Sequence, residues 1–579
     1  MVNPYFELIF FAIMGPELKR HRANPCYRIN IYAIAPTHPL GIKPSGNALL
    51  SAVSNGEEIN RKLLGDLARF PEDLLVELLS YITDPQDLKN LGHCSRILYA
   101  YTYGEDHWRN LYLKEYERLE KLRKSSEIVP FGSQKWRGSW RKSVLALDNE
   151  ALVQANSLIF SDLLYRPYQC SNIDYTSLFK RIIDYERRSS EMCLTLNTEF
   201  GVERFREGSL SLDDFQSKYI NKPFILQAEA GSNRWPKWGF DELLNMFPEE
   251  SFRQEAVQWN LSKYLEYAKN NRDESPLYLF DCKGDPMKKL SQEYEAPAIF
   301  KDDAFKLFQS GEVQCRPDHR WLIAGPGRSG STFHKDPNHT SAWNAVLTGM
   351  KLWVMLPPDV QVPGVSTDKE EEEVTAPIGT SEWILSGFYN DAVKLAELGK
   401  CMITVTFPGE CIYVPSGWWH SVINLTDCVA ITENFVPEPL LVKVLSFLKD
   451  KPTQISGFHL KDLGRSVDAF LRNLQTEEAS SDTVNHISSL KEFVQASKEH
   501  EFDNEDCGVK CESEVYVPVY EFFVELLKRS KHKEAAEMAL EELKKLDQMK
   551  HSERVRDSDM WNELKKGSSE SFSFSFDLE

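Results

Sequence analysis

Two histidines and one aspartate stand where a metal site could form. His334 and Asp336 are two positions apart in the run HKD, and His420 follows a pair of tryptophans. Both runs lie in stretches rich in β-branched and aromatic residues, and in a strand residues i and i+2 point to the same face. Two imidazoles and one carboxylate on one face of a metal ion leave neighbouring positions open, which suits Fe(II) centres that bind dioxygen and a second ligand.

The His-x-acidic spacing is weak evidence by itself. The chain has 13 histidines and 87 acidic residues among 579 positions, so about two such matches are expected by chance. His334 and Asp336 could form a surface turn, and His420 could be a core histidine with satisfied nitrogens. The spacing alone leaves the metal site and these structural roles open.

The segments that must position these residues have the pattern of short strands. Residues 320–357 and 401–435 alternate β-branched and aromatic runs with Pro, Gly and Asn turn signals. This pattern is typical of antiparallel strands in a barrel or jelly roll. Residues 440–549 have helical periodicity instead. We therefore expect an α+β multidomain chain with a β-barrel before a helical region.

Four phrases around the candidate residues resemble the Jumonji-C oxygenases, and most of all the branch of the arginine demethylase and lysyl hydroxylase. They are SPLYLFD (275–281), RWLIAGPGRSGS (320–331), SAWNAVLTGMKLW (341–353) and PGECIYVPSGWWH (408–420). The resemblance covers about residues 264–437. It implies a double-stranded β-helix, a cupin-like jelly roll, that uses Fe(II) with 2-oxoglutarate and dioxygen as co-substrates.

The resemblance also implies the metal ligands and one anchor of the co-substrate. The residues that match the iron ligands of the family are His334, Asp336 and His420. Lys351 matches the lysine that pairs with the distal carboxylate of 2-oxoglutarate, where a cation in a dry pocket is required. Lys351 could instead be an ordinary lysine that extends its ammonium to water.

Three further residues match the polar lining of the co-substrate site. Asn344 and Thr432 fall where the family lines 2-oxoglutarate, and Ser331 stands where a relative has threonine, which keeps the hydroxyl. Asn344 and Thr432 could also serve as structural hydrogen-bonding residues. His339, five residues beyond His334, is expected to be a loop residue only.

A second resemblance concerns residues 66–112, which contain leucines at helical spacing interrupted at Asp84-Pro85. The segment resembles an F-box in its FPEDLL opening and its HWRNLY ending. That resemblance implies a leucine face exposed to a Skp-type adaptor and, through it, to a cullin ubiquitin ligase. The alternative is an unrelated small helical bundle.

These patterns divide the chain into six expected parts. They are a weakly structured segment (1–62), an F-box (63–115), a connector (116–156), the Jumonji-C domain (157–437, with its core barrel at about 318–437), a helical region (438–549) and a disordered tail (550–579).

Charge and composition restrict the partners. The net charge of −19 disfavours a nucleic acid as the main partner, and with it oxygenase action on a tRNA base. No apolar run is long enough to span a membrane, and the eleven cysteines lack a disulfide-like spacing. We expect a protein that lies in the nucleus or otherwise in the cytoplasm.

Two functions from different classes remain. The first is a dioxygenase that hydroxylates or demethylates lysine or arginine side chains of proteins, with histones among the candidate substrates, and that has an F-box to recruit a ubiquitin ligase. The second is a substrate-recognition subunit of an SCF-type ubiquitin ligase whose barrel only binds clients. Both functions can coexist, and a metal-ligand substitution should affect only the first.

Overall fold

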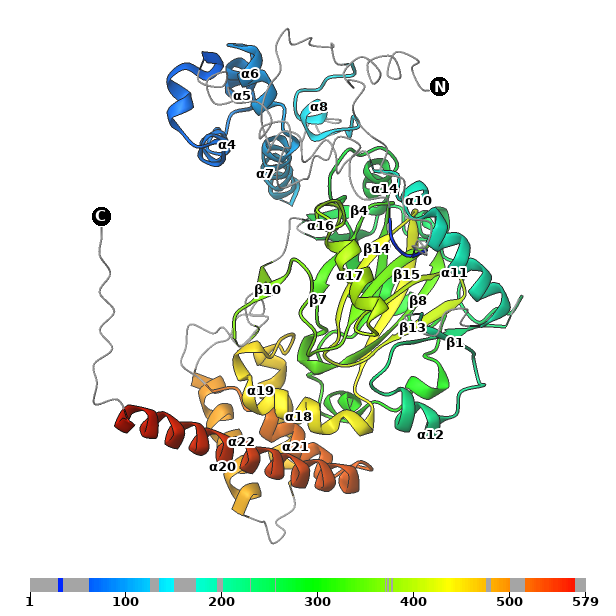
Figure 1. Cartoon of the computed structure of the whole chain (residues 1–579), viewed down its shortest axis with the longest axis vertical. Coiled ribbons are helices and arrows are strands. Elements are labelled where there is room, and N and C mark those ends of the chain that lie inside the picture. Colours follow the sequence, from blue (N-terminus) through cyan, green and yellow to red (C-terminus); the bar gives the residue numbers. More distant parts are fainter. Residues whose placement is uncertain are drawn as a thin grey trace.

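The computed structural model describes residues 30–34, 62–124, 135–149, 173–194 and 201–567, apart from residues 230, 256, 370, 372–373, 376–378, 475–480 and 500–515. Figure 1 shows a central β-structure with short helices of the N-terminal part on one side and the helices of the C-terminal part on another. Within these residues, no helix combines the length and the apolar character that a membrane crossing needs.

Two sheets form the centre of the molecule. The larger has the strand order β1-β2-β13-β8-β15-β6-β5-β3-β4, and the smaller has the order β12-β9-β14-β7. Only β1 and β2 pair in parallel among the described strands of these sheets; every other pair is antiparallel. This arrangement agrees with the jelly roll expected from the sequence.

The strand bounds are as follows. The larger sheet contains β1 (Glu203–Arg206), β2 (Phe224–Gln227), β3 (Ser251–Gln254), β4 (Val257–Asn260), β5 (Leu279–Asp281), β6 (Arg320–Gly325), β8 (Ser341–Thr348), β13 (Glu410–Val414) and β15 (Cys428–Phe435). The smaller sheet contains β7 (Gly330–His334), β9 (Lys351–Leu356), β12 (Met402–Thr406) and β14 (Trp419–Asn424), and a separate hairpin contains β10 (Ser366–Thr367) and β11 (Val374–Thr375).

The interior of the barrel lies between the two sheets. Trp353 and Met355 of the smaller sheet belong to one apolar cluster with Ile412 and Val414 of the larger sheet. Strands β9 and β13 are buried at every position. Strands covered on both faces have nearly continuous apolar sequences, which explains the runs KLWVML and ECIYV.

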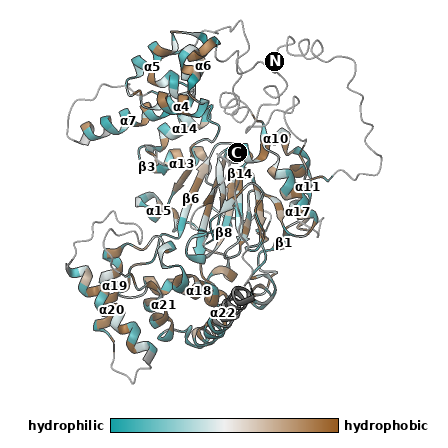
Figure 2. Cartoon of the chain, turned by 60° about the vertical axis from the view of Figure 1, so that its left-hand side comes forward, coloured by the Kyte–Doolittle hydropathy of each residue, from teal (hydrophilic) through white to brown (hydrophobic). Residues whose placement is uncertain are grey.

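Helices cover the outer faces of both sheets, and in Figure 2 they carry hydrophobic and hydrophilic residues side by side. The helices on the smaller sheet are α10 (Tyr175–Leu178), α11 (Lys180–Met192), α16 (Gly379–Leu385) and α17 (Phe388–Glu397). The elements on the larger sheet include η2 (Phe215–Tyr219), α13 (Phe240–Met246), α14 (Leu261–Lys269), α15 (Gly284–Leu290) and η3 (Ala298–Phe300). A short α12 (Leu212–Asp214) precedes η2.

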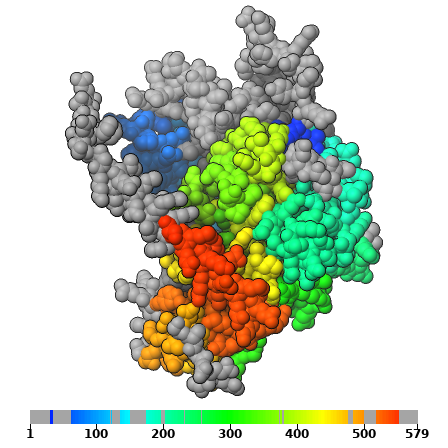
Figure 3. Space-filling view, turned by 60° about the horizontal axis from the view of Figure 1, so that its bottom comes forward, coloured from blue at the N-terminus to red at the C-terminus, as the bar shows by residue number. Residues whose placement is uncertain are grey.

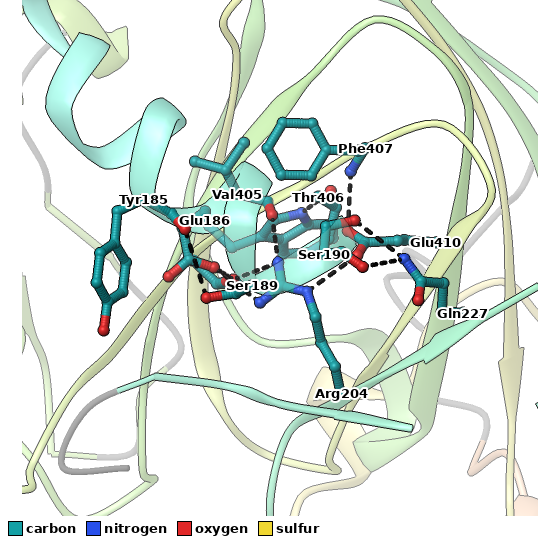
Figure 4. Close-up of polar contacts among 12 residues, drawn as sticks. Tyr185, Glu186, Ser189, Ser190, Arg204, Gln227, Val405, Thr406, Phe407 and Glu410 are labelled. Atoms are coloured by element: carbon teal, nitrogen blue, oxygen red, sulfur yellow. Dashed lines mark hydrogen bonds and ion pairs between the residues drawn. The ribbon is translucent and has the colours of Figure 1, made fainter. Parts of the chain in front are cut away.

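A buried charged network joins the smaller sheet, the larger sheet and α11 (Figure 4). The guanidinium of Arg204 lies 2.9 Å from Glu186 and 2.9 Å from Glu410. Glu186 also accepts a 2.7 Å hydrogen bond from the hydroxyl of Thr404 and another from the hydroxyl of Tyr32. The network pairs its buried charges, as buried charges require.

Residues 30–34 belong to the segment that we expected to be weakly structured, yet they are bound to the barrel. Tyr32 is fully buried, and its carbonyl oxygen accepts a 2.9 Å hydrogen bond from Tyr389. Asn390 forms a reciprocal pair with the backbone of Ile34, at 3.1 and 3.2 Å. The other residues of the 1–62 segment lie outside the described residues, except Lys62.

The N-terminal helices form a unit with a small core of its own. They are η1 (Gly65–Arg69), α4 (Glu72–Ser80), α5 (Pro85–Gly92), α6 (Arg96–Thr102) and α7 (Glu105–Lys124). The Asp84 side chain caps α5 and Pro85 opens it, which confirms the predicted break. Because α7 continues to Lys124, the expected boundary at residue 115 is wrong and falls inside a helix.

A connector links this unit to the barrel through α8 (Trp140–Val144). The Trp140 indole donates a 2.7 Å hydrogen bond to Asp273, which precedes β5, and the guanidinium of Arg141 lies 5.1 Å from the ring centre of Tyr103 in the N-terminal unit. Neighbouring side chains of α8 therefore contact both parts.

The C-terminal helices share a second core, and Figure 3 shows them packed directly against the barrel segment that precedes them. The C-terminal elements are η6 (Glu438–Leu440), α18 (Leu441–Asp450), η7 (Pro452–Gln454), α19 (Leu460–Arg472), α20 (Ser481–Glu499), α21 (Val519–Lys528) and α22 (Lys533–Gly567). The earlier element η4 (Ala304–Gln309) contributes to the same core. Helix α22 passes the expected boundary at residue 549 because no Gly or Pro interrupts it before Gly567. The helix contradicts the expected disorder of residues 550–567, and residues 568–579 lie outside the described residues.

Candidate metal centre

The three predicted metal ligands converge at one end of the smaller sheet. His334 ends β7 and is the cross-strand partner of His420 on β14, with ring centres 4.2 Å apart. Asp336 lies just beyond β7 and precedes η5 (Pro337–His339). The backbone of Asp336 is still extended, so its side chain points to the same face of the chain as that of His334. Ligand atoms of the three residues all lie within 4.8 Å of one another.

Both imidazoles are oriented by the same kind of contact. Nδ1 of His334 lies 2.8 Å from the carbonyl oxygen of Thr332, and Nδ1 of His420 lies 3.1 Å from that of Trp418. When each Nδ1–H donates to its carbonyl, the lone pair of each ring is on Nε2. Such a bond to the remote nitrogen is the usual way in which proteins orient metal-binding histidines.

The aspartate supplies direct evidence that the site fits a cation. Oδ2 of Asp336 is buried and has no hydrogen-bond partner among the described residues. Burial raises the pKa of Asp336, although the nearby His334 and the side chain of Asn434 oppose this, and burial lowers the pKa of His420. An unpaired buried oxygen of this kind is costly, and a divalent cation would satisfy it together with the two imidazoles. The donor set matches the two-histidine, one-carboxylate triad of Fe(II) oxygenases.

Lys351 lies inside the barrel, and only 1% of its surface is exposed. Its ammonium lies 2.7 Å from the hydroxyl of Tyr278 and 2.9 Å from Oδ1 of Asn424, its cross-strand partner on β14. No carboxylate of the described residues forms an ion pair with it. A buried cation held only by neutral oxygens is well suited to bind the carboxylate of a ligand, and it does not extend to water as the alternative interpretation required.

Two of the three polar residues expected to line the co-substrate, Asn344 and Thr432, lie on the larger sheet, and Ser331 lies on the smaller one. Asn344 pairs with Ile412, which faces the barrel interior, and with Thr432 on its other side. Oδ1 of Asn344 is buried without a partner among the described residues, whereas the hydroxyl of Thr432 donates to the carbonyl of Trp343 at 2.6 Å. Asn344 is therefore the better candidate for a ligand contact. Ser331 lies on β7, the strand of His334.

Sequence reasoning missed Tyr278 and Asn424. Tyr278 stands within the phrase SPLYLFD, so its place in that phrase was the available signal. No signal identified Asn424. His339 is not among the clustered ligand atoms, in line with its expected place in a loop, and its Nδ1 lies 2.9 Å from the hydroxyl of Ser416.

A cavity of about 380 Å³ opens beside the loop that carries Asp336. Pro337, Asn434 and Trp321 line it, together with Ser456 and His459 from the C-terminal region. Trp321 is the cross-strand partner of Thr432, so the cavity adjoins strand β6, and none of the three predicted metal ligands lines it.

A second group of potential ligands lies between the barrel and the C-terminal helices. It consists of Asp302, Glu438 and His532. His532 already pairs with Glu438 at 2.8 Å, and Lys531 lies 3.3 Å from Asp302. Because each of these groups has a protein partner, the cluster needs no cation.

Comparison with known proteins agrees with this geometry. The model of the cupin-like domain family matches residues 211–440. The chain is 32% identical to the arginine-specific demethylase JMJ22 of Arabidopsis thaliana over 483 residues, which cover 80% of this chain and 86% of the relative. It is 34% identical over 249 residues to the bifunctional arginine demethylase and lysyl-hydroxylase psr-1 of Caenorhabditis briggsae, over 40% of this chain and 61% of the relative.

A further relative is named for its cofactors. The 2-oxoglutarate and iron-dependent oxygenase JMJD4 of Gallus gallus is 28% identical over 274 residues, which cover 42% of this chain and 62% of the relative. The similarity to JMJ22 extends well beyond the residues that match the cupin-like domain, so that relative also shares parts of the flanking regions.

Proposed function

Because the chain belongs to the Jumonji-C family of Fe(II)- and 2-oxoglutarate-dependent oxygenases, we propose that the centre of His334, Asp336 and His420 hydroxylates or demethylates side chains of protein substrates. The observation that carries the proposal is the convergence of three ligand atoms within 4.8 Å around a buried carboxylate oxygen that has no partner among the described residues. A barrel that only recognised clients would have no use for that arrangement.

Each side chain has a separate task in this proposal. His334, Asp336 and His420 hold the iron, which with 2-oxoglutarate and dioxygen supplies the oxidising power for a C–H bond of the substrate. Lys351 pairs with the distal carboxylate of 2-oxoglutarate, and Tyr278 orients its ammonium. The apolar residues of the barrel interior keep water away from the site.

The substrates that we propose are lysine or arginine side chains of proteins, with histones among the candidates. The proposal follows the names of the relatives, an arginine-specific demethylase and a bifunctional arginine demethylase and lysyl-hydroxylase. Oxidation at a side-chain carbon leaves a stable alcohol, whereas oxidation of an N-methyl group releases formaldehyde. The net charge of −19 supports protein rather than nucleic acid as the main partner, and a nuclear or otherwise cytoplasmic location is part of the same proposal.

The first test is an anaerobic titration of the full chain with Fe(II) and 2-oxoglutarate, followed by addition of oxygen. We expect succinate from the wild type and at least a 100-fold lower yield from Asp336→Ala. Wild-type protein that binds no metal and forms no succinate would exclude the proposal. Methylated and unmethylated peptides then distinguish an added oxygen atom from released formaldehyde by mass spectrometry.

We further propose that the N-terminal helical unit binds a Skp-type adaptor and, through it, a cullin ubiquitin ligase. The specific observation is an apolar surface on and beside α4, where Phe70 (43%), Leu74 (44%), Leu78 (48%) and Tyr81 (73%) are exposed. Leu75 and Leu79 of the same helix fill the small core instead. An exposed apolar patch of this kind typically marks a partner site.

The adaptor proposal has a simple test. Leu74→Asp in the full chain should abolish capture of a purified Skp-type adaptor and leave succinate formation unchanged. The matched control is Leu398→Asp, since Leu398 is also exposed, at 69%, but lies on the barrel side of the molecule. Equal adaptor capture by Leu74→Asp and the wild type would contradict the proposal, and His334→Ala should leave capture intact.

A further inference from the structure

The loop after the metal ligand Asp336 has an unusual backbone. Asn338 and His339 are consecutive residues with positive φ angles, of 53° and 56°. Left-handed conformations are unfavourable for residues other than glycine, and asparagine tolerates them better than most. Two such residues in succession keep this shape only when the surroundings hold them.

The side chain of Asn338 is held by the C-terminal region. Its amide nitrogen donates to the carbonyl oxygen of Ser456 at 2.8 Å, and its amide oxygen accepts from the backbone N–H of Ser456 at 3.0 Å. Asn338 is only 3% exposed, so its two bonds are largely shielded from water. The pair fixes both the position and the plane of the amide.

The partner backbone is itself anchored. Ile455 and Phe458, on either side of Ser456, are buried in the core of the C-terminal helices. The ring of Phe458 lies 5.1 Å from that of Phe308, whose segment precedes the barrel. The turn at Ser456 therefore has a place set by the packing of the C-terminal region and not by the loop of the metal ligand.

A second contact joins the same loop to the strand of His420. The hydroxyl of Ser416 donates to the carbonyl oxygen of His339 at 2.6 Å and lies 2.9 Å from Nδ1 of the same residue. Ser416 belongs to the turn between β13 and β14, and β14 carries His420. The His339 ring also lies 5.3 Å from Phe447 of α18. The loop is thus bound on both sides.

We infer that Asn338 is a positioning residue for the metal ligand Asp336, and that the helical C-terminal region is thereby a structural part of the metal centre. The inference rests on the proposed function. Metal ligands must be held closely in place, and the partners that orient them affect metal affinity about 10- to 100-fold. Asn338 does not contact the carboxylate of Asp336; its pair with Ser456 fixes the backbone two residues after Asp336 and positions that ligand through the chain.

The test compares Asn338→Gly with the wild type in the full chain, because glycine keeps the positive φ and removes only the side-chain bonds. We expect the affinity for Co(II) to fall about 10- to 100-fold and the Co(II) absorption spectrum of the loaded protein to change. The KM for 2-oxoglutarate of the metal-saturated protein should stay within about twofold, since Asn338 does not touch that site.

Two comparisons keep the outcome clear. Asn390 makes the same reciprocal pair with the backbone of Ile34, so Asn390→Ala against Asn338→Ala measures what such a pair does away from the metal. An Asn338→Gly protein with wild-type Co(II) affinity and spectrum, whatever its melting temperature, would overturn the inference. Wild-type protein that binds no Co(II) would instead contradict the proposed function, so the two failures differ.

Discussion

The hydroxyl of Tyr278 lies 2.7 Å from the ammonium of Lys351 in the barrel interior. Asn424 completes the neutral set of oxygens around this cation, at 2.9 Å. An ammonium this deeply buried loses most of its hydration, and neutral oxygens replace only part of it. Lys351 therefore has charge left to pair with an incoming carboxylate, and Tyr278 determines the direction in which it does so.

Replacing Lys351 by methionine should weaken the binding of 2-oxoglutarate without affecting the metal. We expect the KM for 2-oxoglutarate to rise about 10- to 100-fold, because a buried charge-assisted contact is worth about 1.5–3 kcal/mol. Tyr278→Phe, which removes only the orienting hydroxyl, should raise it a few-fold. Succinate formation measured over a range of 2-oxoglutarate concentrations, at saturating metal, gives the KM of each variant. An unchanged KM in Lys351→Met would show that the co-substrate binds elsewhere.

The metal ligands could be predicted from the sequence because the flanking phrases resemble a known family. The His-x-Asp spacing alone could not distinguish a metal site from a structural role of the same residues. Tyr278 lies within the phrase SPLYLFD, but the phrase does not reveal its role, which depends on a partner 73 positions away. Asn338 escaped prediction for the same physical reason, since Ser456 is 118 positions away in a separate helical region. Contacts between distant segments leave no local pattern in a single sequence.

The fold was predictable where the pattern was long. The antiparallel strands between 320 and 435 have strong β-branched and aromatic runs, and the structure has strands there. Strands β1 to β5 have only three or four residues each, which is too short for a period to be detected, so the sequence included them in the 157–437 domain without fixing their bounds. The boundary at residue 115 failed because α7 continues without a Pro or Gly.

Replacing Arg204 by methionine should destabilise the barrel strongly. The change leaves Glu186 and Glu410 buried without their shared cation, and breaking a buried ion pair costs about 3–5 kcal/mol. Thermal and urea unfolding measure the loss. Lys218→Met is the control, because the pair of Lys218 with Asp214 is exposed to water and should contribute little to stability. Equal losses of unfolding free energy in Arg204→Met and Lys218→Met would contradict a stabilising role of the Arg204 network.

The C-terminal helices should lose stability in acid through Glu525. Burial tends to raise the pKa of this carboxyl, but hydrogen bonds from His486, Lys528 and Arg529 outweigh it and lower the pKa to about 2. A carboxyl whose folded pKa is depressed stabilises the folded state above its unfolded pKa. That contribution is lost as the pH falls from about 4.5 through about 2.

Hydrogen exchange of the C-terminal helices across this pH range tests the point. Glu525→Gln should reduce protection at neutral pH and flatten the dependence on pH between about 4.5 and 2. Glu541→Gln makes the same change at an exposed position of α22 and should leave the profile as in the wild type. An acid profile of Glu525→Gln that matches the wild type would mean that another group controls the transition.

Metal binding should stabilise the protein, and the stabilisation should depend on Asp336. Because Oδ2 of this residue is buried without a partner among the described residues, a bound cation relieves a cost that the metal-free protein carries. Co(II) at about 100 times its dissociation constant should add about 2.7 kcal/mol, visible as a higher melting temperature that EDTA reverses. Asp336→Ala should abolish the shift and leave the metal-free protein at least as stable as the wild type.

Asp302→Ala, in the second cluster, should keep the full shift, since its group is already paired with Lys531. A shift that survives in Asp336→Ala and disappears in Asp302→Ala would place the metal in the second cluster and exclude the barrel site.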